Sequence, residues 1–422
     1  MQRRRRALAR RLRRVRASVP HTGIVGGGSE SSSVAAMTVP TRDDFLLDPD
    51  VVFLNHGSFG ATPKVVFDEY QRLQLAMERN PVEWLGRRAD DLMAAARADV
   101  AAYVGAAADD LVFFPNPTTA INMVAKSLHL APGDEIVTTD HEYGAMDRTW
   151  RKLTAEAGAT YVRVPIPVPV TTATDFVERV WSAVTARTRV LFLSHLTSAT
   201  ALAFPVHELC RRARAAGILA IVDGAHVPAH IPLDLRTLDC DIYTGALHKW
   251  MCAPKGCSFL WARPDVQPML QPLVVSWGWE SDHPGPSQFV DHHEWQGTRD
   301  LAPFLAASAA VRFVTSHDWA AVQTEGHHRT LRARARIDEL TGLGALSPDA
   351  TPDHQWIGQL ASIRLPADTD VVALKARLFD EYRIEVPVHR WNDIPLLRIS
   401  CTAHTTDHDV DALVVALRSE LR

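Results

Sequence analysis

Long apolar runs, lysines and cysteines are all scarce in this chain of 422 residues. No stretch approaches the roughly 18 consecutive apolar residues that identify a membrane-spanning helix, so we expect no membrane segment. The five cysteines have no framework spacing, and an odd, sparse count indicates free thiols in a reducing compartment, here the cytoplasm. The charge is nearly balanced, with 45 Lys and Arg against 49 Asp and Glu, which argues against a nucleic-acid-binding protein.

Metal-ligand spacings are also missing from the sequence. Histidines cluster at His292-His293 and at His226 with His230, but neither an HExxH motif nor a paired-cysteine motif is present. We therefore predict no metal site. The apolar fraction of 46%, in contrast, is typical of a globular chain that buries a large core.

The first 36 residues differ in composition from the rest of the chain. Nine arginines lie within residues 1–16, and Glu30 is the only acid before Met37. Glycine and serine clusters follow the arginines, without the apolar segment of a secretory signal. We predict that residues 1–36 are a disordered tail or an over-extended reading frame, with Met37 as the natural start. An organellar transit peptide is the alternative.

From Met37 onward, short apolar runs alternate with longer helical patterns. Most of the expected strands are continuous apolar runs, which is typical of strands buried on both faces. They lie at residues 51–55, 111–115, 135–139, 161–165, 189–195, 218–223, 241–243 and 257–262. The helical patterns between them include residues 63–79, 88–104, 118–128 and 206–216. This alternation predicts an α/β fold with a doubly wound, mainly parallel sheet.

A loop rich in Trp, His, Pro and Gly at residues 271–300 marks the predicted end of the large domain. Beyond it we expect helices at 302–316 and 320–340 and strands at 363–365 and 396–400. The predicted organisation is therefore a large domain over residues 37–300 and a smaller α+β domain over residues 301–422.

One of the six lysines stands in an unusual setting. Lys249 lies between His248 and Trp250 in an apolar and aromatic segment, whereas most other lysines lie in polar helical contexts. Such a lysine is either a buried structural cation or a chemically used amine. Burial lowers the pKa of an amine, which suits Schiff-base chemistry.

Two further features fit the same chemistry as this lysine. Asp223 ends an apolar strand, at the sheet edge where α/β folds bind ligands, and a carboxylate there can pair with a protonated ring nitrogen. Its alternative role is to cap a helix. Residues 116–122 follow another strand and open a helix, where amides and threonine hydroxyls form an anion site. An anion site, an acid and a lysine in this order along the chain predict pyridoxal 5'-phosphate.

These residues belong to a series of motifs through which the chain resembles the pyridoxal-phosphate enzymes of the class V aminotransferase fold, which include cysteine desulfurases. Within that group it is most similar to the isopenicillin N epimerase-like branch, from about Asp43 to the C-terminus. The motifs are LNHGSFG at 54–60, NPTTAIN at 116–122, HEY at 141–143, SHLTS at 194–198, DGAH at 223–226, HKW at 248–250, EWQGTRD at 294–300 and RIS at 398–400. The resemblance implies the aspartate-aminotransferase-like fold, an amino-acid-type substrate, and a homodimer with shared active sites.

The resemblance also implies a role for each matching residue. Lys249 would form a Schiff base with the cofactor and shuttle the α-proton, and Asp223 would keep the ring nitrogen protonated. Tyr143 would stack on the ring and His226 would lie near its phenolic oxygen; core packing is the alternative for both. Arg398 would bind the substrate carboxylate as a bidentate fork, with a structural ion pair as its alternative.

The remaining assignments concern the phosphate and the substrate. Thr118, the amide of Thr119, and His248 would bind the phosphate, although Ala246 stands where many relatives carry a serine. Thr298 would reach the phosphate of the neighbouring subunit. The resemblance also places one serine at the cofactor and two residues at the substrate: Ser198, Asn55 and His56.

The reaction class stays open among epimerisation, transamination, and elimination or C–S bond cleavage. All of these begin with loss of the α-proton to Lys249. Persulfide chemistry is disfavoured, because no cysteine precedes Arg398 in its segment and Cys401 follows it in an apparent strand. A non-catalytic relative that keeps the fold is the other class of hypothesis, and the intact Asp223 and Lys249 argue against it.

Overall fold

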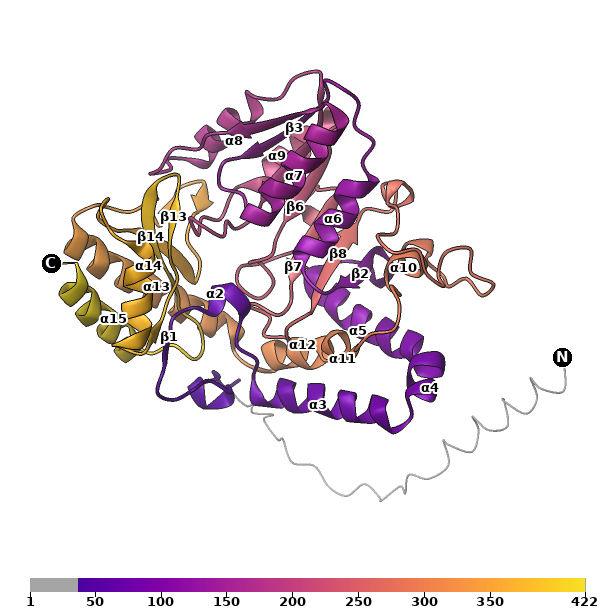
Figure 1. The fold of residues 1–422 in the computed structure, drawn as a ribbon, viewed down its shortest axis with the longest axis horizontal. Helices are drawn as coiled ribbons and strands as arrows, with labels where there is room; N and C mark the ends of the chain where they lie inside the picture. The colour runs from indigo at the N-terminus through magenta and orange to yellow at the C-terminus, as the bar shows by residue number, and fades with distance from the viewer. Residues whose placement is uncertain (1–36, 422) are drawn as a thin grey trace, which may run out of the picture. The chain divides into compact units, whose positions relative to one another are not determined.

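The predicted alternation of strands and helices forms a seven-stranded sheet in the computed structural model, which describes residues 37–421 (Figure 1). Its strand order is β2-β8-β7-β6-β5-β3-β4. The strands are β2 (Leu111–Phe114), β3 (Glu135–Thr139), β4 (Thr160–Val164), β5 (Thr188–Ser194), β6 (Leu219–Asp223), β7 (Ile242–Ala246) and β8 (Ser258–Ala262). Only β8 is antiparallel to its neighbours, so the predicted doubly wound, mainly parallel α/β sheet is confirmed.

Both faces of this sheet are buried, which explains why its strands read as continuous apolar runs. Successive side chains of a strand point to opposite faces. In β2, for example, Phe113 joins one hydrophobic cluster while Val112 and Phe114 join another. The first cluster includes side chains of α5 (Ala89–Val104), α8 (Ala173–Trp181), α9 (Val206–Ala215), α11 (Ala302–Leu305) and α12 (Ala307–Ser316). The second includes those of α6 (Pro117–Ser127), α7 (Gly144–Ala157) and α10 (Gln288–His293).

A separate core forms around a three-stranded antiparallel sheet of order β11-β14-β13, drawn toward the yellow end of the colour scale in Figure 1. Its strands are β11 (Leu360–Arg364), β13 (Val388–Trp391) and β14 (Ile394–Ser400). The helices around it are α13 (Trp319–Thr341), α14 (Val371–Asp380) and α15 (Asp407–Glu420). This arrangement is the α+β pattern expected for the C-terminal part. The division at residue 300 stays a prediction; the helices α11 and α12 that follow it pack on α3 (Lys64–Arg79) and α5.

The N-terminal segment joins the C-terminal core. Strand β1 (Val52–Phe53) pairs in parallel with β12 (Ile384–Glu385), and Leu54 is fully buried in the C-terminal cluster. The short helix α2 (His56–Phe59) follows directly, and Figure 1 shows it between this core and the large sheet. A residue near the start of the chain is thereby held beside residues near its end. Other short elements include α4 (Pro81–Glu83), β9 (Ala350–Thr351) and β10 (His354–Gln355).

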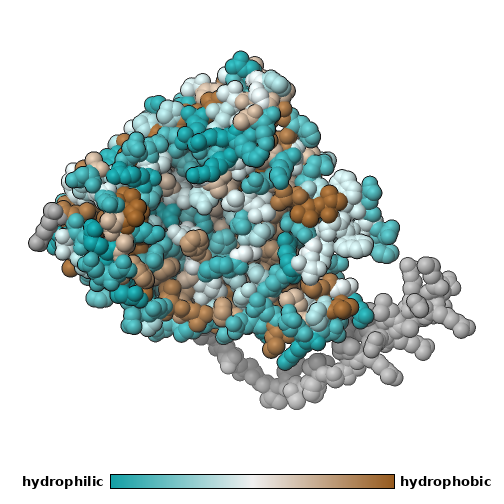
Figure 2. All heavy atoms as spheres, in the orientation of Figure 1, coloured by the Kyte–Doolittle hydropathy of each residue, from teal (hydrophilic) through white to brown (hydrophobic). Residues whose placement is uncertain are grey.

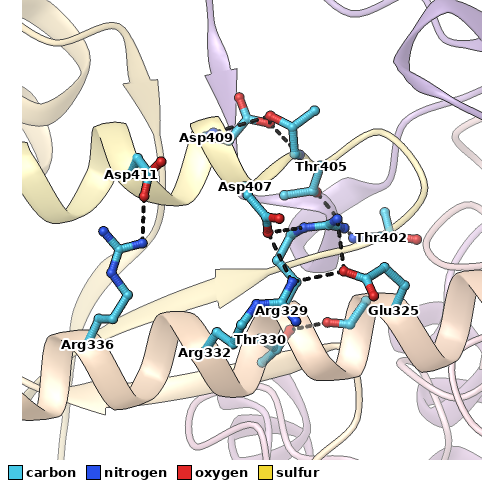
Figure 3. Close-up of polar contacts among 12 residues, drawn as sticks. Glu325, Arg329, Thr330, Arg332, Arg336, Thr402, Thr405, Asp407, Asp409 and Asp411 are labelled. Carbon is cyan, nitrogen blue, oxygen red and sulfur yellow. Dashed lines mark hydrogen bonds and ion pairs between the residues drawn. The ribbon is translucent and has the colours of Figure 1, made fainter.

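Charged side chains connect α13 with α15 (Figure 3). Arg329 and Arg332 both contact Asp407 at 3.0 Å, and Arg336 contacts Asp411 at 2.7 Å. Most of these side chains are well exposed, and exposed ion pairs contribute at most about 1 kcal/mol each. The buried apolar residues between the two helices, such as Ile337 and Leu413, therefore supply most of their association.

The surface is largely polar. In Figure 2 the visible face of the described part is mostly teal, and its apolar residues form separate patches. Within residues 37–421, no helix combines the length and apolar character that a membrane crossing requires. The predicted Arg-rich tail lies outside the described residues.

Candidate active site

A cavity of about 540 Å³ lies at the carboxyl edge of the large sheet. Because all strands but β8 run the same way, the segments that follow β2, β5, β6 and β7 meet there. The cavity brings together nine of the residues predicted from the sequence: Thr118, Thr119, Tyr143, Ser198, Asp223, His226, His248, Lys249 and Arg398. Such a convergence of charged and polar groups in one cavity is typical of a binding site.

The amine of Lys249 lies in the turn after β7 and faces this cavity. Its Nζ is 3.0 Å from Nε2 of His226. Burial, and secondarily the charge of Arg398, lowers the pKa of Lys249 to about 7, although Asp223 acts in the opposite direction. A substantial fraction of the amine is therefore unprotonated at neutral pH, the form that attacks a carbonyl carbon.

The carboxylate of Asp223 ends β6, next to β7 in the sheet. One oxygen, Oδ1, accepts a hydrogen bond of 2.9 Å from the amide of Ala225. Burial raises the pKa of Asp223, against the opposing effects of that hydrogen bond and of Lys249. The predicted neighbourhood of Asp223 and Lys249 is thus present, and the buried carboxylate is available for a protonated ring nitrogen.

Glu142 is a second acid at the site, half-buried, that was not singled out from the sequence. Its carboxylate accepts hydrogen bonds from the hydroxyls of Ser194 at 2.6 Å and Thr139 at 2.8 Å. Burial raises its pKa to about 7, and the nearby charge of Asp223 acts in the same direction. Ser194 itself lines the cavity. The signal was present in the sequence, because Glu142 follows an apolar strand and stands within the HEY motif.

The N-terminus of α6 closes one end of the cavity. Asn116 caps this helix, and its Oδ1 accepts hydrogen bonds from the amide of Thr119 at 2.9 Å and from the hydroxyl of the same residue at 3.0 Å. The Thr119 amide is therefore engaged here, and its use for a phosphate stays a prediction. His248 also lines the cavity and donates from Nδ1 to the carbonyl of Cys257 at 2.9 Å, which leaves Nε2 for a ligand.

Arg398 extends from β14 of the C-terminal core into the cavity. Its Nη1 donates to the carbonyl of Ser198 at 2.7 Å and to the Ser198 hydroxyl at 3.1 Å, and its Nη2 donates to the Ser58 hydroxyl at 2.9 Å. No carboxylate of residues 37–421 forms an ion pair with it, and burial lowers its pKa to about 10. A buried guanidinium without a counter-charge favours an anionic ligand. The structural ion pair considered for Arg398 is thus not found in the described part of the chain.

Three predicted site residues do not line the cavity. His56 is fully buried, with Nε2 near the carbonyl of Lys249 at 3.1 Å and Nδ1 near Nε2 of His404 at 3.0 Å. Asn55 donates to Glu385 at 2.9 Å and accepts from the hydroxyl of Ser58. Both lie next to residues of the site without lining the cavity, and their contact with the substrate stays a prediction. Thr298, predicted to serve a neighbouring subunit, lies exposed in the loop before α11.

The residues of the cavity fit pyridoxal 5'-phosphate. They supply an amine with a lowered pKa, a buried carboxylate, a helix N-terminus and the aromatic ring of Tyr143, which is 48% exposed and free to stack on a ligand. The amine of Lys249 and the buried guanidinium of Arg398 also lie in one cavity, and neither forms an ion pair with a carboxylate of the described residues. The site is therefore suited to a ligand with negative charges.

Comparisons with known proteins agree with this fit. The sequence profile of the aminotransferase class-V family matches residues 52–413. Isopenicillin N epimerase of Amycolatopsis lactamdurans is 38% identical over 398 residues, which cover 91% of this chain and 99% of the relative. The isopenicillin N epimerase of Streptomyces clavuligerus is 34% identical over 386 residues, with coverages of 89% and 96%.

Solved structures show the same fold at lower sequence identity. The apo cysteine desulfurase from Thermococcus onnurineus has a TM-score of 0.78 at 20% identity, covering 92% of this chain and 99% of its own. A C-DES variant with glycine covalently linked to its PLP cofactor has a TM-score of 0.78 at 21% identity, covering 90% and 99%.

Proposed function

Because this chain belongs to the aminotransferase class-V family of pyridoxal-phosphate enzymes, we propose that it epimerises the α-carbon of an amino-acid-bearing metabolite. The observation that carries this proposal is the meeting of Lys249, Asp223 and Arg398 in one cavity of a chain 38% identical to an isopenicillin N epimerase. The cofactor itself and the enzyme class are the ones predicted from the motifs, and both are confirmed. The reaction type and the residue roles are our proposals.

Each of these residues has a distinct part in the proposed reaction. When bound, pyridoxal phosphate supplies an electron sink for the pair of electrons left at the α-carbon. Arg398, oriented by Ser58 and Ser198, binds the substrate carboxylate. Lys249 accepts the α-proton at Nζ, and Asp223 holds a proton on the facing ring nitrogen. Epimerisation requires return of a proton to the opposite face of the α-carbon; transamination and elimination differ only after this first proton transfer.

The experiment that tests this proposal is a substrate panel in deuterated water. L- and D-amino acids and larger amino-acid conjugates are incubated with the holoenzyme and followed by NMR and chiral chromatography. We expect deuterium at the α-carbon of one substrate class and accumulation of both configurations. Keto-acid products would favour transamination, and release of a thiol or sulfide would favour lyase chemistry. Absence of α-deuteration throughout the panel would contradict the proposal.

We propose that the enzyme is a homodimer with shared active sites and that it works in the cytoplasm. The five cysteines are free and buried, which supports a reducing compartment. Support for the dimer comes from the loop before α11, where Thr298 is exposed and lies outside its own cavity. The loop before α10 exposes Val275 and Trp277, the latter to 85%. Exposed aromatic surface of this kind is typical of an interface.

Thr298→Ala should therefore weaken cofactor binding about tenfold, because one hydrogen bond to a charged phosphate is lost. Fluorescence titration of the apo-enzyme with pyridoxal phosphate measures this change. Sedimentation of the wild-type holoenzyme should give a dimer, and an active monomer at working concentration would contradict the shared site. Thr341→Ala, a change at the end of α13, serves as the control and should leave cofactor affinity unchanged.

Replacing the five cysteines should leave turnover within about twofold of the wild type. Every one of them is buried, and burial raises the pKa of each thiol, to about 12 for Cys252 and about 11 for Cys401. No thiolate is therefore available at neutral pH, whereas persulfide formation requires one. The measurement is kcat for single Cys→Ser variants and for the fivefold variant, with melting temperature as the control. Loss of activity confined to one variant, together with a persulfide on the corresponding cysteine of the wild type, would restore the desulfurase alternative.

A further inference from the structure

Trp250 follows Lys249 directly and lies behind the active site. Its indole is buried and does not line the cavity, so the roles proposed above leave it unused. The indole Nε1 donates to Nδ1 of His226 at 3.4 Å. The indole also stacks on His230, with 3.8 Å between ring centroids and 23° between the planes. Trp250 is therefore fixed from two sides.

The contact with Trp250 determines which nitrogen of His226 carries the proton. An indole N–H can only donate, so Nδ1 of His226 must accept. Burial and the neighbouring cations hold the pKa of His226 well below its usual range, so the ring is neutral and has a single proton. That proton is then on Nε2, which lies 3.0 Å from Nζ of Lys249. Because Nε2 donates, the lysine must accept, and only the unprotonated amine can do so.

A second unambiguous donor fixes the neighbouring histidine in the same way. The backbone amide of Gln359, just before β11, donates to Nε2 of His230 at 2.7 Å. The proton of His230 is therefore on Nδ1, which donates to the carbonyl of His226 at 2.9 Å. The backbone and the ring of His226 are thus both held by groups whose direction of donation is determined.

We propose that Trp250 is a positioning residue whose indole N–H holds His226 in the Nε2–H tautomer and thereby keeps the amine of Lys249 unprotonated. This inference rests on the proposed use of Lys249 in the reaction. With Trp250 absent, the His226 ring could place its proton on Nδ1 and accept a hydrogen bond from a lysine ammonium. The amine ready to attack the cofactor carbonyl would then be less populated.

Other groups around Lys249 also influence its protonation. Asp223 on β6 favours the ammonium form, and Arg398 on β14 opposes it. His248 lies on the same segment as Lys249, and His56 lies on α2. Burial lowers the pKa of both histidines below neutrality, so they are uncharged near pH 7. None of these groups donates to Nδ1 of His226, so none can replace the indole in setting the tautomer.

The test is Trp250→Phe, which keeps an aromatic ring against His230 but removes the N–H. The first measurement is ¹⁵N NMR of the histidine rings in apo-protein, with His226→Gln used to assign the signal. We expect the Nε2–H tautomer in the wild type and a mixture in Trp250→Phe. The second is the pH dependence of the rate at which pyridoxal phosphate attaches to Lys249, which should shift upward by about one pH unit. In turnover, kcat at neutral pH should fall roughly tenfold with little change in KM.

Trp319→Phe is a matched control. The indole of Trp319 is also buried, and it donates to the carbonyl of Ala229 at 2.8 Å, in the same loop as His226 but away from its ring. This variant should lose a similar amount of stability and leave both the tautomer and the pH profile unchanged. An Nδ1–H tautomer in the wild type would overturn the proposal, even if Trp250→Phe does not fold. So would a Trp250→Phe variant whose activity falls without a shift in the pH profile. The tautomer and the pH dependence of cofactor attachment are measured without substrate, so these two results stand apart from the test of reaction type.

Discussion

Lys249→Ala should reduce turnover by at least about 10³-fold and eliminate covalent attachment of the cofactor, while the fold stays intact. In the proposed reaction two functions are lost at once, because the same amine would bind the cofactor carbonyl and accept the α-proton. The pKa of about 7 makes Lys249 the amine that reacts at neutral pH. Borohydride reduction followed by peptide mapping should place the label on Lys249 in the wild type and nowhere in the variant.

Lys249→Ala should change the stability of the apo-protein in the opposite direction to the activity. A lysine whose folded pKa lies below its ordinary value of 10.5 binds fewer protons when folded than when unfolded. Stability of the wild type therefore rises with pH between about 7 and 10.5 through this residue, and below pH 7 the buried amine must be charged. Lys249→Ala removes this dependence, so its melting temperature near pH 7 should equal or exceed that of the wild type. Thermal denaturation across this pH window measures the difference.

Lys255→Ala is the matched control for this prediction. Lys255 lies six residues further along the same segment, is exposed, and its Nζ donates to the hydroxyl of Thr62 at 3.3 Å. The Lys255→Ala variant should keep the cofactor chromophore and most of the activity. A borohydride label on Lys255, or a Lys249→Ala protein that still turns over, would show that the wrong lysine has been assigned.

Much of this site was predictable because it depends on order along the chain. Asp223 and Lys249 follow strands close in sequence, and a parallel sheet places the carboxyl ends of neighbouring strands together. The pairing of β6 with β7 confirms that reasoning. Continuous apolar runs likewise predicted strands buried on both faces, as found. Such features follow from local pattern and from the geometry of one sheet.

Features that depend on distant contacts could not be obtained in this way. The pairing of β1 with β12 joins segments more than 300 residues apart, and no local pattern specifies it. A motif marks His56 as special, but its sequence does not say whether the ring faces the cavity or, as found, the back of the lysine turn. The HEY motif marks Glu142 as well, but the raised pKa of its carboxyl depends on the surroundings that folding creates beside Ser194. Burial of a polar group is a tertiary property that composition does not reveal.

Asp223→Asn should reduce kcat by roughly 10²–10³-fold, because an amide has no negative charge with which to hold a proton on the facing ring nitrogen. The same substitution should not destabilise the apo-protein, so its effects on stability and on activity should again differ in sign. The folded pKa of Asp223 is raised by burial, so its carboxyl binds more protons folded than unfolded, and wild-type stability falls as pH rises from about 4 toward that raised pKa. At pH 7 the buried charge is a cost that the asparagine variant does not have. Its apo-protein should melt at or above the wild-type temperature.

Asp241→Asn is the control variant, because it shows what the loss of a buried acid with a purely structural role does to stability and activity. Asp241 is equally buried, at 3% exposed against 4% for Asp223, but it lies before β7 at the other edge of the sheet. It accepts from the amide of Ala220 at 2.7 Å and pairs with Arg263 at 2.8 Å. Removing its charge breaks the buried ion pair and leaves Arg263 with only the exposed Asp265 as a partner, so Asp241→Asn should lower the melting temperature and leave kcat/KM nearly unchanged. Calorimetry of both apo-variants with steady-state kinetics of both holoenzymes tests the contrast; a structural role for Asp223 predicts the same loss of stability in each.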